Sequence, residues 1–345
     1  MKIGLVGYQG SGKSSLYQWL TGVEPDPAKS HQDQSAMAVI PEPRVDELVR
    51  IYTPKKVTRA AIEITDTPGL NRDHDGNAQK LACLREADSM VLVVAGFGGM
   101  DPKVEYQSFY EDLLLADMEL VARRIERVCE SLNRKALPKE EREHLTFELE
   151  TLQKINDGLE AGVPIKRDSL DEQQQKILSS FSLFTQKSHM VLVNTADDEQ
   201  DTDRFRGMLG AEITVLAAPV GLQLELTKLS PEEGDELVQE MGLKPVERDE
   251  VIRTMMDVSG QMLFFTAGEK EVRTWILRKH GTAVEAAGSI HTDLARGFIR
   301  AEIMQVKDII RLGSEREVKA AGLVRQEPKD YVIQDGDCLF IKFSV

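Results

Sequence analysis

The sequence has few of the features that mark several special classes of protein. Cysteine occurs only three times in 345 residues, and Cys83, Cys129 and Cys338 are widely spaced without a C-x-x-C pair, which argues against a disulfide framework or a zinc site. The longest apolar runs, such as residues 90–95, are far shorter than the ~18 residues that a membrane-spanning helix needs. We therefore expect a soluble, cytoplasmic protein with no membrane partner.

Positive charge is also scarce. The chain has 43 Lys and Arg residues against 58 Asp and Glu, a formal net charge of −15, which argues against binding DNA or other nucleic acid through a broadly basic surface. Residues 261–345 differ, because this segment contains 13 basic and 12 acidic residues and is therefore nearly neutral. Any contact with RNA therefore has to be local.

The hydrophobic pattern alternates between strands and helices over much of the chain. Helical patterns at residues 14–20 and 78–87 separate strand candidates, and the polar stretch 22–43 is interpreted as a loop. The strand candidates are residues 1–6, 60–65, 89–95, 190–193 and 212–217. Such alternation predicts an α/β fold with a doubly wound, mostly parallel sheet.

A helical insertion, residues 104–188, interrupts this alternation. Its apolar residues follow the four-three spacing of a heptad seam. They are Leu114, Met118, Val121, Ile125, Val128 and Leu132, with Leu145, Leu149, Leu152 and Leu159 on the return. We expect an antiparallel coiled-coil arm that turns near Leu137 and Pro138, and two helices packed on the main domain are the alternative.

The last 85 residues change character again. Short strand candidates and turn signals predict a compact α+β module. The expected division is a nucleotide-binding domain of residues 1–103 and 189–260, a helical domain of residues 104–188, and a C-terminal domain of residues 261–345.

The strongest functional signal lies in residues 7–14, GYQGSGKS, which match the GxxxxGK[ST] phosphate-binding loop between a strand and a helix. Glycines let successive backbone N–H groups surround phosphate oxygens, and the helix N-terminus adds partial positive charge. Lys13 is expected at the β and γ phosphates and Ser14 on Mg²⁺. The nucleotide-binding residues expected here are Gly7, Gly10, Ser11, Gly12, Lys13, Ser14 and Ser15.

A second motif, Asp66 to Gly69, ends a strand and fits the DxxG switch of nucleotide-sensing proteins. It would place a carboxylate near the metal and the Gly69 N–H near the γ phosphate. The next residue, a water-orienting glutamine in small GTPases, is Leu70 here, so unassisted hydrolysis should be slow. Alternatively, Leu70 only packs, and the water-orienting residue lies elsewhere, for example Asn71 or His74.

Residues 194–197, Asn-Thr-Ala-Asp, follow a strand and match the base-binding NKxD motif except for its lysine. The carboxylate of Asp197 suits the adjacent N–H donors of guanine, but the missing lysine removes the stem that covers the purine. The motif alone therefore leaves both ATP and GTP open, as well as an ordinary loop.

Together these motifs resemble the YchF family, the Obg-like ATPases, from end to end. The most specific segments are residues 264–273 (FFTAGEKEVR), 290–293 (IHTD), 297–302 (GFIRAE) and 330–337 (DYVIQDGD). They resemble the family's TGS domain, a ubiquitin-like β-grasp module.

The resemblance implies a translation-factor-related P-loop NTPase in which an apolar residue, here Leu70, replaces the catalytic glutamine. It also implies adenine preference, with Asp197 in place of the family's glutamate, so ATP is favoured over GTP. Ser30 aligns with a Mg²⁺-binding threonine of the first switch, and Pro219 and Val220 replace a Ser-Ala base-binding motif. A shortened second switch at residues 71–76 indicates a divergent member.

The leading hypothesis is a Mg²⁺-dependent NTPase that cleaves the β–γ bond slowly and acts as a switch. Lys13, Gly69 and Leu70 are its catalytic positions, and Ser14, Asp66 and Ser30 its metal-binding positions. The resemblance implies the ribosome or associated RNA as the partner, through the helical arm and the TGS domain. The alternatives are a GTPase of the same family and a nucleotide-gated binding module with negligible hydrolysis.

Overall fold

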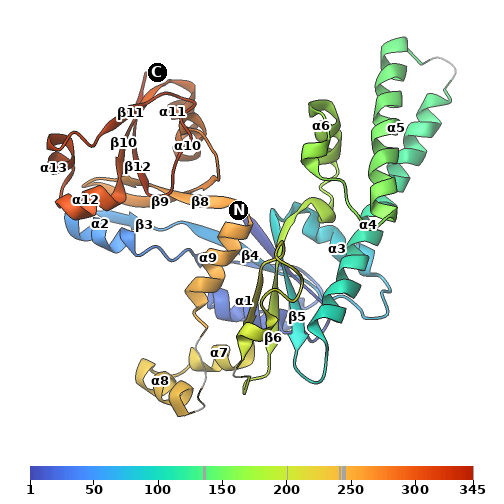
Figure 1. Ribbon diagram of the computed structural model, residues 1–345, viewed down its shortest axis with the longest axis horizontal. Coiled ribbons are helices and arrows are strands. Elements are labelled where there is room, and N and C mark those ends of the chain that lie inside the picture. Colours follow the sequence, from blue (N-terminus) through green and yellow to red (C-terminus); the bar gives the residue numbers. More distant parts are fainter. Residues whose placement is uncertain (135–136, 200, 241, 243–245, 345) are drawn as a thin grey trace. The chain divides into compact units, whose positions relative to one another are not determined.

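The computed structural model describes residues 1–134, 137–199, 201–240, 242 and 246–344 (Figure 1). The chain divides into two compact units. The first unit comprises residues 1–36 and 63–246, and the second comprises residues 37–62 and 247–345. This division differs from the expected domains at residues 37–62 and 247–260, which were expected in the nucleotide-binding domain and belong to the second unit.

A six-stranded sheet is the centre of the nucleotide-binding part of the chain, with strand order β2-β4-β1-β5-β6-β7. The strands are β1 (Lys2–Val6), β2 (Gln34–Val39), β4 (Ala61–Asp66), β5 (Ser89–Gly96), β6 (Ser188–Thr195) and β7 (Val215–Ala218). β1 pairs in parallel with β4 and β5, and β6 pairs in parallel with β5 and β7. This confirms the predicted doubly wound parallel sheet.

Strand β2 corrects the interpretation of residues 22–43 as a loop. Its residues alternate between exposed and less exposed positions, and only Ala38 is fully buried. An edge strand with so few apolar side chains resembles a polar loop in sequence. The central strand β5, by contrast, is buried along its length from Ser89 to Ala95 and was recognisable as a continuous apolar run.

The first unit also contains several helices. They include α1 (Lys13–Thr21), α3 (Asn77–Ala82), α6 (Glu172–Ser180), α7 (Val220–Leu226) and α8 (Pro231–Glu240). The long helix α4 (Pro102–Leu132) packs its first turns on the sheet through Tyr106, Phe109 and Leu113, in one cluster with Leu92 and Val193. Within the described part of the chain, none of the helices has the length and apolarity to span a bilayer.

The rest of α4 pairs with α5 (Lys139–Glu160) in a helical hairpin (Figure 1). All ten predicted seam residues belong to the cluster between these helices, with Val121, Val128, Leu152 and Leu159 buried. Arg124 and Glu148 add a bidentate ion pair with N–O distances of 2.7 and 2.9 Å. The predicted antiparallel arm is confirmed, and only the start of α4 packs on the main sheet.

The second unit contains another six-stranded sheet, with order β11-β10-β12-β8-β9-β3. Its strands are β3 (Lys56–Thr58), β8 (Gln261–Ala267), β9 (Glu271–Arg278), β10 (Phe298–Gln305), β11 (Arg325–Glu327) and β12 (Asp337–Phe343). Its helices are α2 (Arg44–Tyr52), α9 (Arg248–Val258), α10 (Ala283–Ile290), α11 (Thr292–Arg296), α12 (Val306–Leu312) and α13 (Glu315–Ala320). The antiparallel β8–β9 hairpin, the parallel contact of β8 with β12 and helix α10 on one face agree with the predicted β-grasp module.

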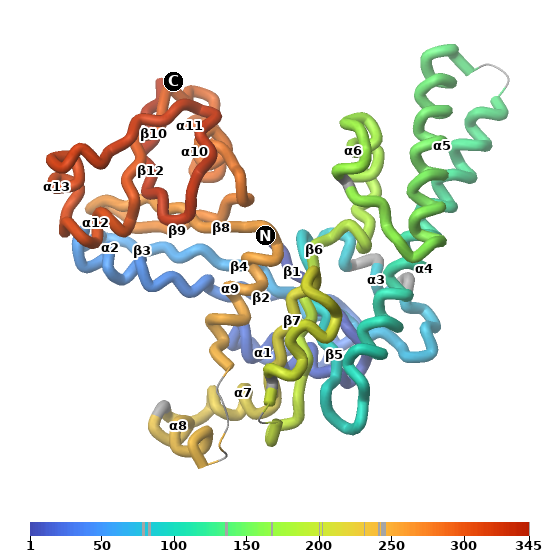
Figure 2. Tube along the Cα trace, viewed as in Figure 1, coloured from blue at the N-terminus to red at the C-terminus, as the bar shows by residue number. Residues whose placement is uncertain are grey.

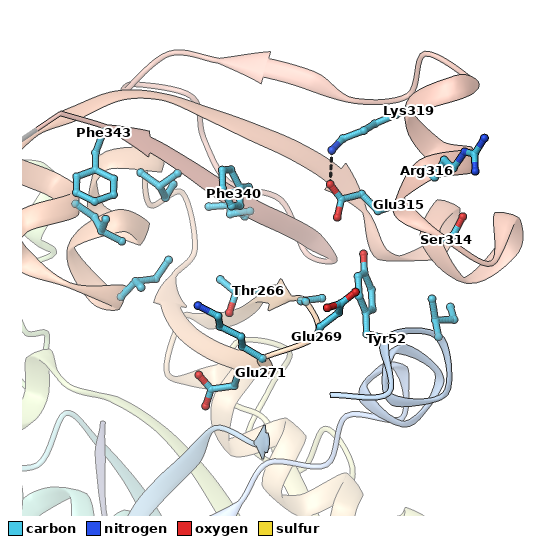
Figure 3. Close-up of a pocket in the computed structure, with 18 residues that line it drawn as sticks. Tyr52, Thr266, Glu269, Glu271, Ser314, Glu315, Arg316, Lys319, Phe340 and Phe343 are labelled. Atoms are coloured by element: carbon cyan, nitrogen blue, oxygen red, sulfur yellow. Dashed lines mark hydrogen bonds and ion pairs between the residues drawn. The ribbon is translucent and has the colours of Figure 1, made fainter. Parts of the chain in front are cut away.

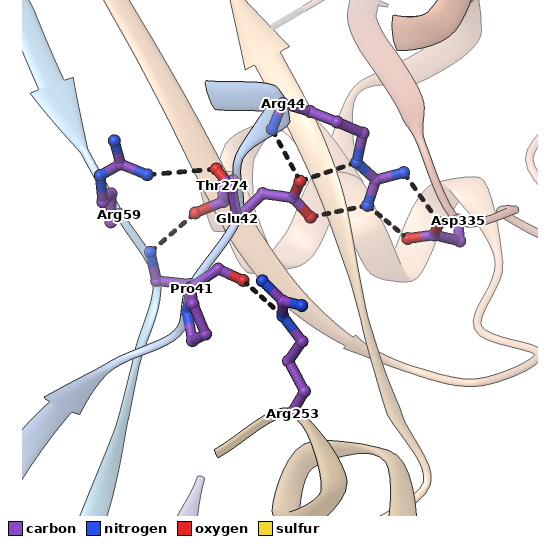
Figure 4. Close-up of polar contacts among 8 residues, drawn as sticks. Pro41, Glu42, Arg44, Arg59, Arg253, Thr274 and Asp335 are labelled. Atoms are coloured by element: carbon purple, nitrogen blue, oxygen red, sulfur yellow. Dashed lines mark hydrogen bonds and ion pairs between the residues drawn. The ribbon is translucent and has the colours of Figure 1, made fainter. Parts of the chain in front are cut away.

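Residues 37–62 are built into this second unit. Strand β3 pairs in parallel with β9, and Val45 and Leu48 of α2 share an apolar cluster with Phe265 of β8 (Figure 2). Polar contacts reinforce the packing: the Arg44 guanidinium donates to Glu42 and to Asp335, with N–O distances of 2.6 to 3.0 Å (Figure 4). The segment that links the two switch motifs is therefore structurally part of the C-terminal module.

Candidate nucleotide-binding site

The phosphate-binding loop lies between the end of β1 and the start of α1. Gly10 and Gly12 have φ angles of +84° and +97°, a conformation that favours glycine. A Cβ atom on Gly12 would lie only 2.1 Å from Nδ2 of Asn194. The backbone conformation thus favours glycine at both positions, and close packing requires it at Gly12 as well. The position of the loop before a helix leaves backbone N–H groups to face an anion.

Lys13 is the buried cation of this loop. Its side chain is 6% exposed, and Nζ donates to the carbonyl oxygens of Gly7 (3.0 Å) and Tyr8 (2.9 Å). Burial lowers the pKa of Lys13 to about 8, partly offset by the negative charge of Asp66. At neutral pH the ammonium is still mainly protonated, and it is poorly solvated. A negatively charged ligand therefore stabilises this buried ammonium more strongly than it would stabilise the ammonium of an exposed lysine.

Ser14 and Asp66 form the expected metal-binding pair. The Ser14 hydroxyl donates to Oδ2 of Asp66 at 2.6 Å, and Oδ1 of Asp66 is buried without a hydrogen-bond partner among the described residues. Burial raises the pKa of Asp66. A serine oxygen beside an unsatisfied carboxylate fits Mg²⁺, which takes few protein ligands and completes its shell with phosphate oxygens and water.

A cavity of about 740 Å³ brings most of these predicted residues together. Its wall consists of residues Gln9, Gly10, Gly12, Lys13, Ser14, Ser15, Pro25, Asp26, Pro27, Ser30, His31, Gln32, Gln34, Asp66, Thr67, Pro68, Gly69, Asn71 and Lys80. The volume is typical of a pocket for a small ligand or cofactor. Ser30 lies on this wall, and its role as a metal ligand stays a prediction.

The side chain of Leu70 points into the protein core. It is 2% exposed and belongs to the cluster that includes Tyr8, Leu81 and Phe109. Its backbone fixes the loop: Leu70 N–H donates to Gly7 O (3.1 Å), and Gln9 N–H donates to Leu70 O (2.9 Å). The structure therefore supports the packing alternative for the side chain, while the backbone connects the switch to the phosphate-binding loop.

This location of Leu70 leads to a prediction for the Leu70→Gln variant, which restores the residue usual in small GTPases. Burying an unpaired amide in place of an apolar side chain is expected to lower the free energy of unfolding by about 2–4 kcal/mol. Hydrolysis should not accelerate, because the new side chain lacks a path to the cavity. Urea unfolding and phosphate release test this, with Leu70→Met as the volume-matched control. A tenfold faster hydrolysis in Leu70→Gln would contradict the packing role.

Two polar residues predicted for base recognition lie together at the end of β6 and the start of α7. Asn194 donates from Nδ2 to Ser11 O (3.0 Å) and accepts at Oδ1 from Val220 N–H (3.1 Å), while Asp197 accepts from Leu222 N–H (3.0 Å). Pro219 precedes α7 directly. These contacts join the base-binding motif to the phosphate-binding loop, but Asn194, Asp197, Pro219 and Val220 are not part of the cavity wall.

Two features of the site escaped sequence reasoning. Asp112 of α4 is 4% exposed and accepts hydrogen bonds from the Tyr8 hydroxyl (3.1 Å) and Asn77 Nδ2 (3.0 Å), and it contacts His74 Nδ1 (2.8 Å). It thereby fixes the loop after Leu70 from a position about forty residues away in the sequence. The second feature is Lys80, a lysine in a short helix, which no motif distinguishes from an ordinary surface lysine.

The second unit holds a larger cavity of about 960 Å³ with a different character (Figure 3). Its charged side chains are balanced: Glu269, Glu271 and Glu315 are acidic, and Lys270, Arg316 and Lys319 are basic. Glu315 and Lys319 pair with each other. The aromatic rings of Phe340 and Phe343 are 56% and 44% exposed. Without an excess of positive charge, this cavity does not suit a triphosphate, so the nucleotide site is assigned to the first unit.

The parallel sheet, the glycine loop before α1, the buried lysine and the serine–aspartate pair define a P-loop nucleoside triphosphatase. Comparison with known proteins agrees. Residues 2–126 match the family model described as 50S ribosome-binding GTPase, and residues 262–344 match the YchF-GTPase C-terminal model, described as a protein of unknown function.

Several relatives match over nearly the whole chain. The chain is 31% identical to Ribosome-binding ATPase YchF of Bacillus subtilis (strain 168), over 99% of both chains. It is 32% identical to Obg-like ATPase 1 of Oryza sativa subsp. japonica, over 100% of this chain and 92% of the relative. The solved YchF GTPase of Schizosaccharomyces pombe superimposes with a TM-score of 0.82 at 26% identity, covering 99% of this chain and 97% of the other. The chain belongs to the YchF family, the Obg-like ATPases.

Proposed function

We propose that this protein is a Mg²⁺-dependent NTPase, with ATP favoured over GTP, that hydrolyses the β–γ bond slowly and acts as a molecular switch. The observation that carries the proposal is the arrangement in one cavity of the buried ammonium of Lys13, the Ser14–Asp66 pair and the glycine loop at the start of α1. A phosphate chain needs a cation, N–H donors and a metal site, and this cavity offers all three.

The residues divide the work by position. Backbone N–H groups from Gly10 to Ser15 bind the α and β phosphates, and Lys13 neutralises charge at the β and γ phosphates. Ser14 and Asp66 would hold Mg²⁺, which would supply positive charge to the phosphate chain; Ser30 is a further proposed ligand. Gly69 N–H orients the γ phosphate. Because Leu70 offers no group that can orient water, the intrinsic rate is low.

The base preference rests on Asn194 and Asp197. The bacterial and rice relatives are named ATPases, whereas the fission-yeast structure is named a GTPase. Asp197 already accepts a hydrogen bond from Leu222 N–H, which holds its short side chain near α7. The ATPase names of the bacterial and rice relatives are what favours ATP as the nucleotide, and GTP is the alternative.

The partner follows from the relatives named ribosome-binding. We extend this to the present chain, with the α4–α5 arm and the C-terminal module as the contacting parts and a cytoplasmic location as a consequence. A nucleotide-gated binding module with negligible hydrolysis is the competing function, because Leu70 and the shortened switch would permit it.

Calorimetric titration tests the proposed nucleotide specificity. Mg²⁺-loaded protein is titrated with non-hydrolysable ATP and GTP analogues, and the titrations are repeated with Asp197→Glu and with EDTA. Tighter ATP binding, about tenfold weaker without Mg²⁺, is the expected result. Tighter GTP binding that Asp197→Glu reverses would show that Asp197 recognises guanine. Absence of binding to either analogue would overturn the proposed function.

A further inference from the structure

A second lysine, Lys80 of α3, lies at the phosphate end of the cavity. Its Nζ donates to Gly69 O (2.9 Å) and to Oδ1 of Asn71 (2.8 Å). Gly69 is the glycine of the DxxG switch, and Lys80 lines the same cavity as Lys13 and Ser14. The side chain therefore reaches from α3 to the turn that faces the γ phosphate.

Three positively charged side chains, those of Lys13, Arg72 and Lys80, lie near this end of the cavity, which favours a negatively charged ligand. Burial is the main cause of the lowered pKa of Lys13, and the nearby positive charges of Lys80 and Arg72 lower it further. Arg72 is engaged by Glu105 (2.7 Å) and stacks over the ring of Tyr8, with its guanidinium 5.2 Å from the ring centre. Lys80 Nζ lies at the rim of the switch turn, within hydrogen-bond distance of Gly69 O and Asn71 Oδ1. Lys80 is thus placed to add charge where the γ phosphate would lie.

We infer that Lys80 is a catalytic cation supplied in cis, which contacts the γ-phosphate oxygens in the transition state. The inference rests on the proposed NTPase function. In other P-loop NTPases an arginine from the same chain or from a partner supplies this charge. Here a lysine held on the switch turn by Gly69 O supplies it, while the side chain of Leu70 is turned into the core and contributes no polar group.

The proposed reaction transfers no proton to or from Lys80. The oxygen of a water molecule forms a bond to the γ phosphorus while the bond from this phosphorus to the β–γ bridging oxygen breaks. The bonding electron pair stays on the bridging oxygen of the nucleoside diphosphate. One proton of the water remains on the released phosphate and the other passes to solvent. Lys80 only donates hydrogen bonds to oxygens whose charge rises, which stabilises the transition state more than the ground state.

A purely structural role of Lys80 predicts a different pattern of nucleotide affinities. If Lys80 served only to fix the turn at residues 69–71, its loss would loosen the switch and weaken the binding of every nucleotide state alike. Lys80→Gln keeps a hydrogen-bond donor but removes the charge, and Lys80→Arg keeps the charge. Lys228→Ala, at an exposed lysine paired with Glu225, is a control outside the site.

The experiment compares these variants by single-turnover hydrolysis and by two binding constants. One is for a non-hydrolysable triphosphate analogue, and the other is for the diphosphate with Mg²⁺ and fluoroaluminate, a transition-state mimic. For Lys80→Gln we expect hydrolysis to fall about 100-fold and fluoroaluminate-complex affinity to fall in parallel, with triphosphate affinity changed less than about threefold. Lys80→Arg should keep more activity than Lys80→Gln, and Lys228→Ala should match the wild type.

Two results would overturn the inference alone while leaving the proposed function intact. One is hydrolysis by Lys80→Gln within threefold of an active wild type. The other is an equal loss of triphosphate and fluoroaluminate-complex affinity, which would assign Lys80 a structural role. A wild type that binds no nucleotide or forms no product would instead overturn the proposed function, and the inference with it.

Discussion

Replacing Lys13 with alanine is expected to weaken the binding of Mg²⁺-nucleotide by at least about 100-fold without unfolding the protein. The lysine supplies charge-assisted hydrogen bonds to the phosphates, each worth roughly 1.5–3 kcal/mol, and about 2.7 kcal/mol corresponds to 100-fold in affinity. The fold should tolerate the change, because the substitution removes a poorly solvated ammonium. Lys13 itself lines the cavity, so water can take the place of its ammonium at the carbonyl oxygens of Gly7 and Tyr8.

Calorimetry with an ATP analogue and thermal unfolding together check this expectation for Lys13→Ala. Lys228→Ala removes an exposed lysine of the same unit and should leave both quantities unchanged. If Lys13→Ala bound nucleotide within threefold of the wild type, the loop would not be the phosphate site. If it unfolded at a much lower temperature, the role of Lys13 would be structural.

Asp117→Ala is expected to have the largest effect on stability, a loss of about 3–5 kcal/mol in the free energy of unfolding. The Asp117 side chain is fully buried in α4 and accepts from Phe184 N–H (3.0 Å), Thr185 N–H (2.9 Å) and the Thr185 hydroxyl (3.0 Å). It also pairs with Arg85 at 3.3 Å. Its removal takes the carboxylate acceptor from the N–H groups of Phe184 and Thr185 and the counter-charge from Arg85.

The position of Asp117 explains why one side chain has so large an expected effect. It joins α4, at the base of the helical arm, to the segment of Phe184 and Thr185 that returns to β6, so the arm and the sheet depend on the same contact. Urea unfolding measures the change, with Glu119→Ala as a control, because Glu119 is exposed on the same helix and paired only with Arg123 in the described contacts. A loss below 1 kcal/mol in Asp117→Ala would contradict the anchoring role.

Sequence patterns predicted the features that depend on local chemistry. The phosphate-binding loop, Ser14 and Asp66 were identifiable because their chemistry requires particular residues at fixed spacing. The ten seam residues of the helical arm were identifiable because a coiled coil repeats every seven residues. The structure places the seam residues in one cluster and the site residues around one cavity.

The features that depend on tertiary context could not be predicted. Strand β2 has one fully buried side chain, and β3 pairs with β9, more than two hundred residues away in the sequence. Motif alignment set Leu70 at the position of the catalytic glutamine and left core packing open, and only the structure shows that its side chain joins the core. Lys80 and Asp112 enter the site from helices without any motif. In each case the structural role of the residue or strand depends on packing between segments that are distant in the sequence. A local sequence pattern therefore cannot predict it.

Single-turnover hydrolysis of γ-labelled ATP and GTP by Mg²⁺-loaded protein, with and without Lys13→Ala, tests the central claim most directly. The proposed NTPase function predicts slow release of labelled phosphate by the wild type, faster with ATP than with GTP, and none by the variant. If the wild type binds nucleotide but releases no phosphate over hours, the protein is a nucleotide-gated binding module and the claim of catalysis is wrong.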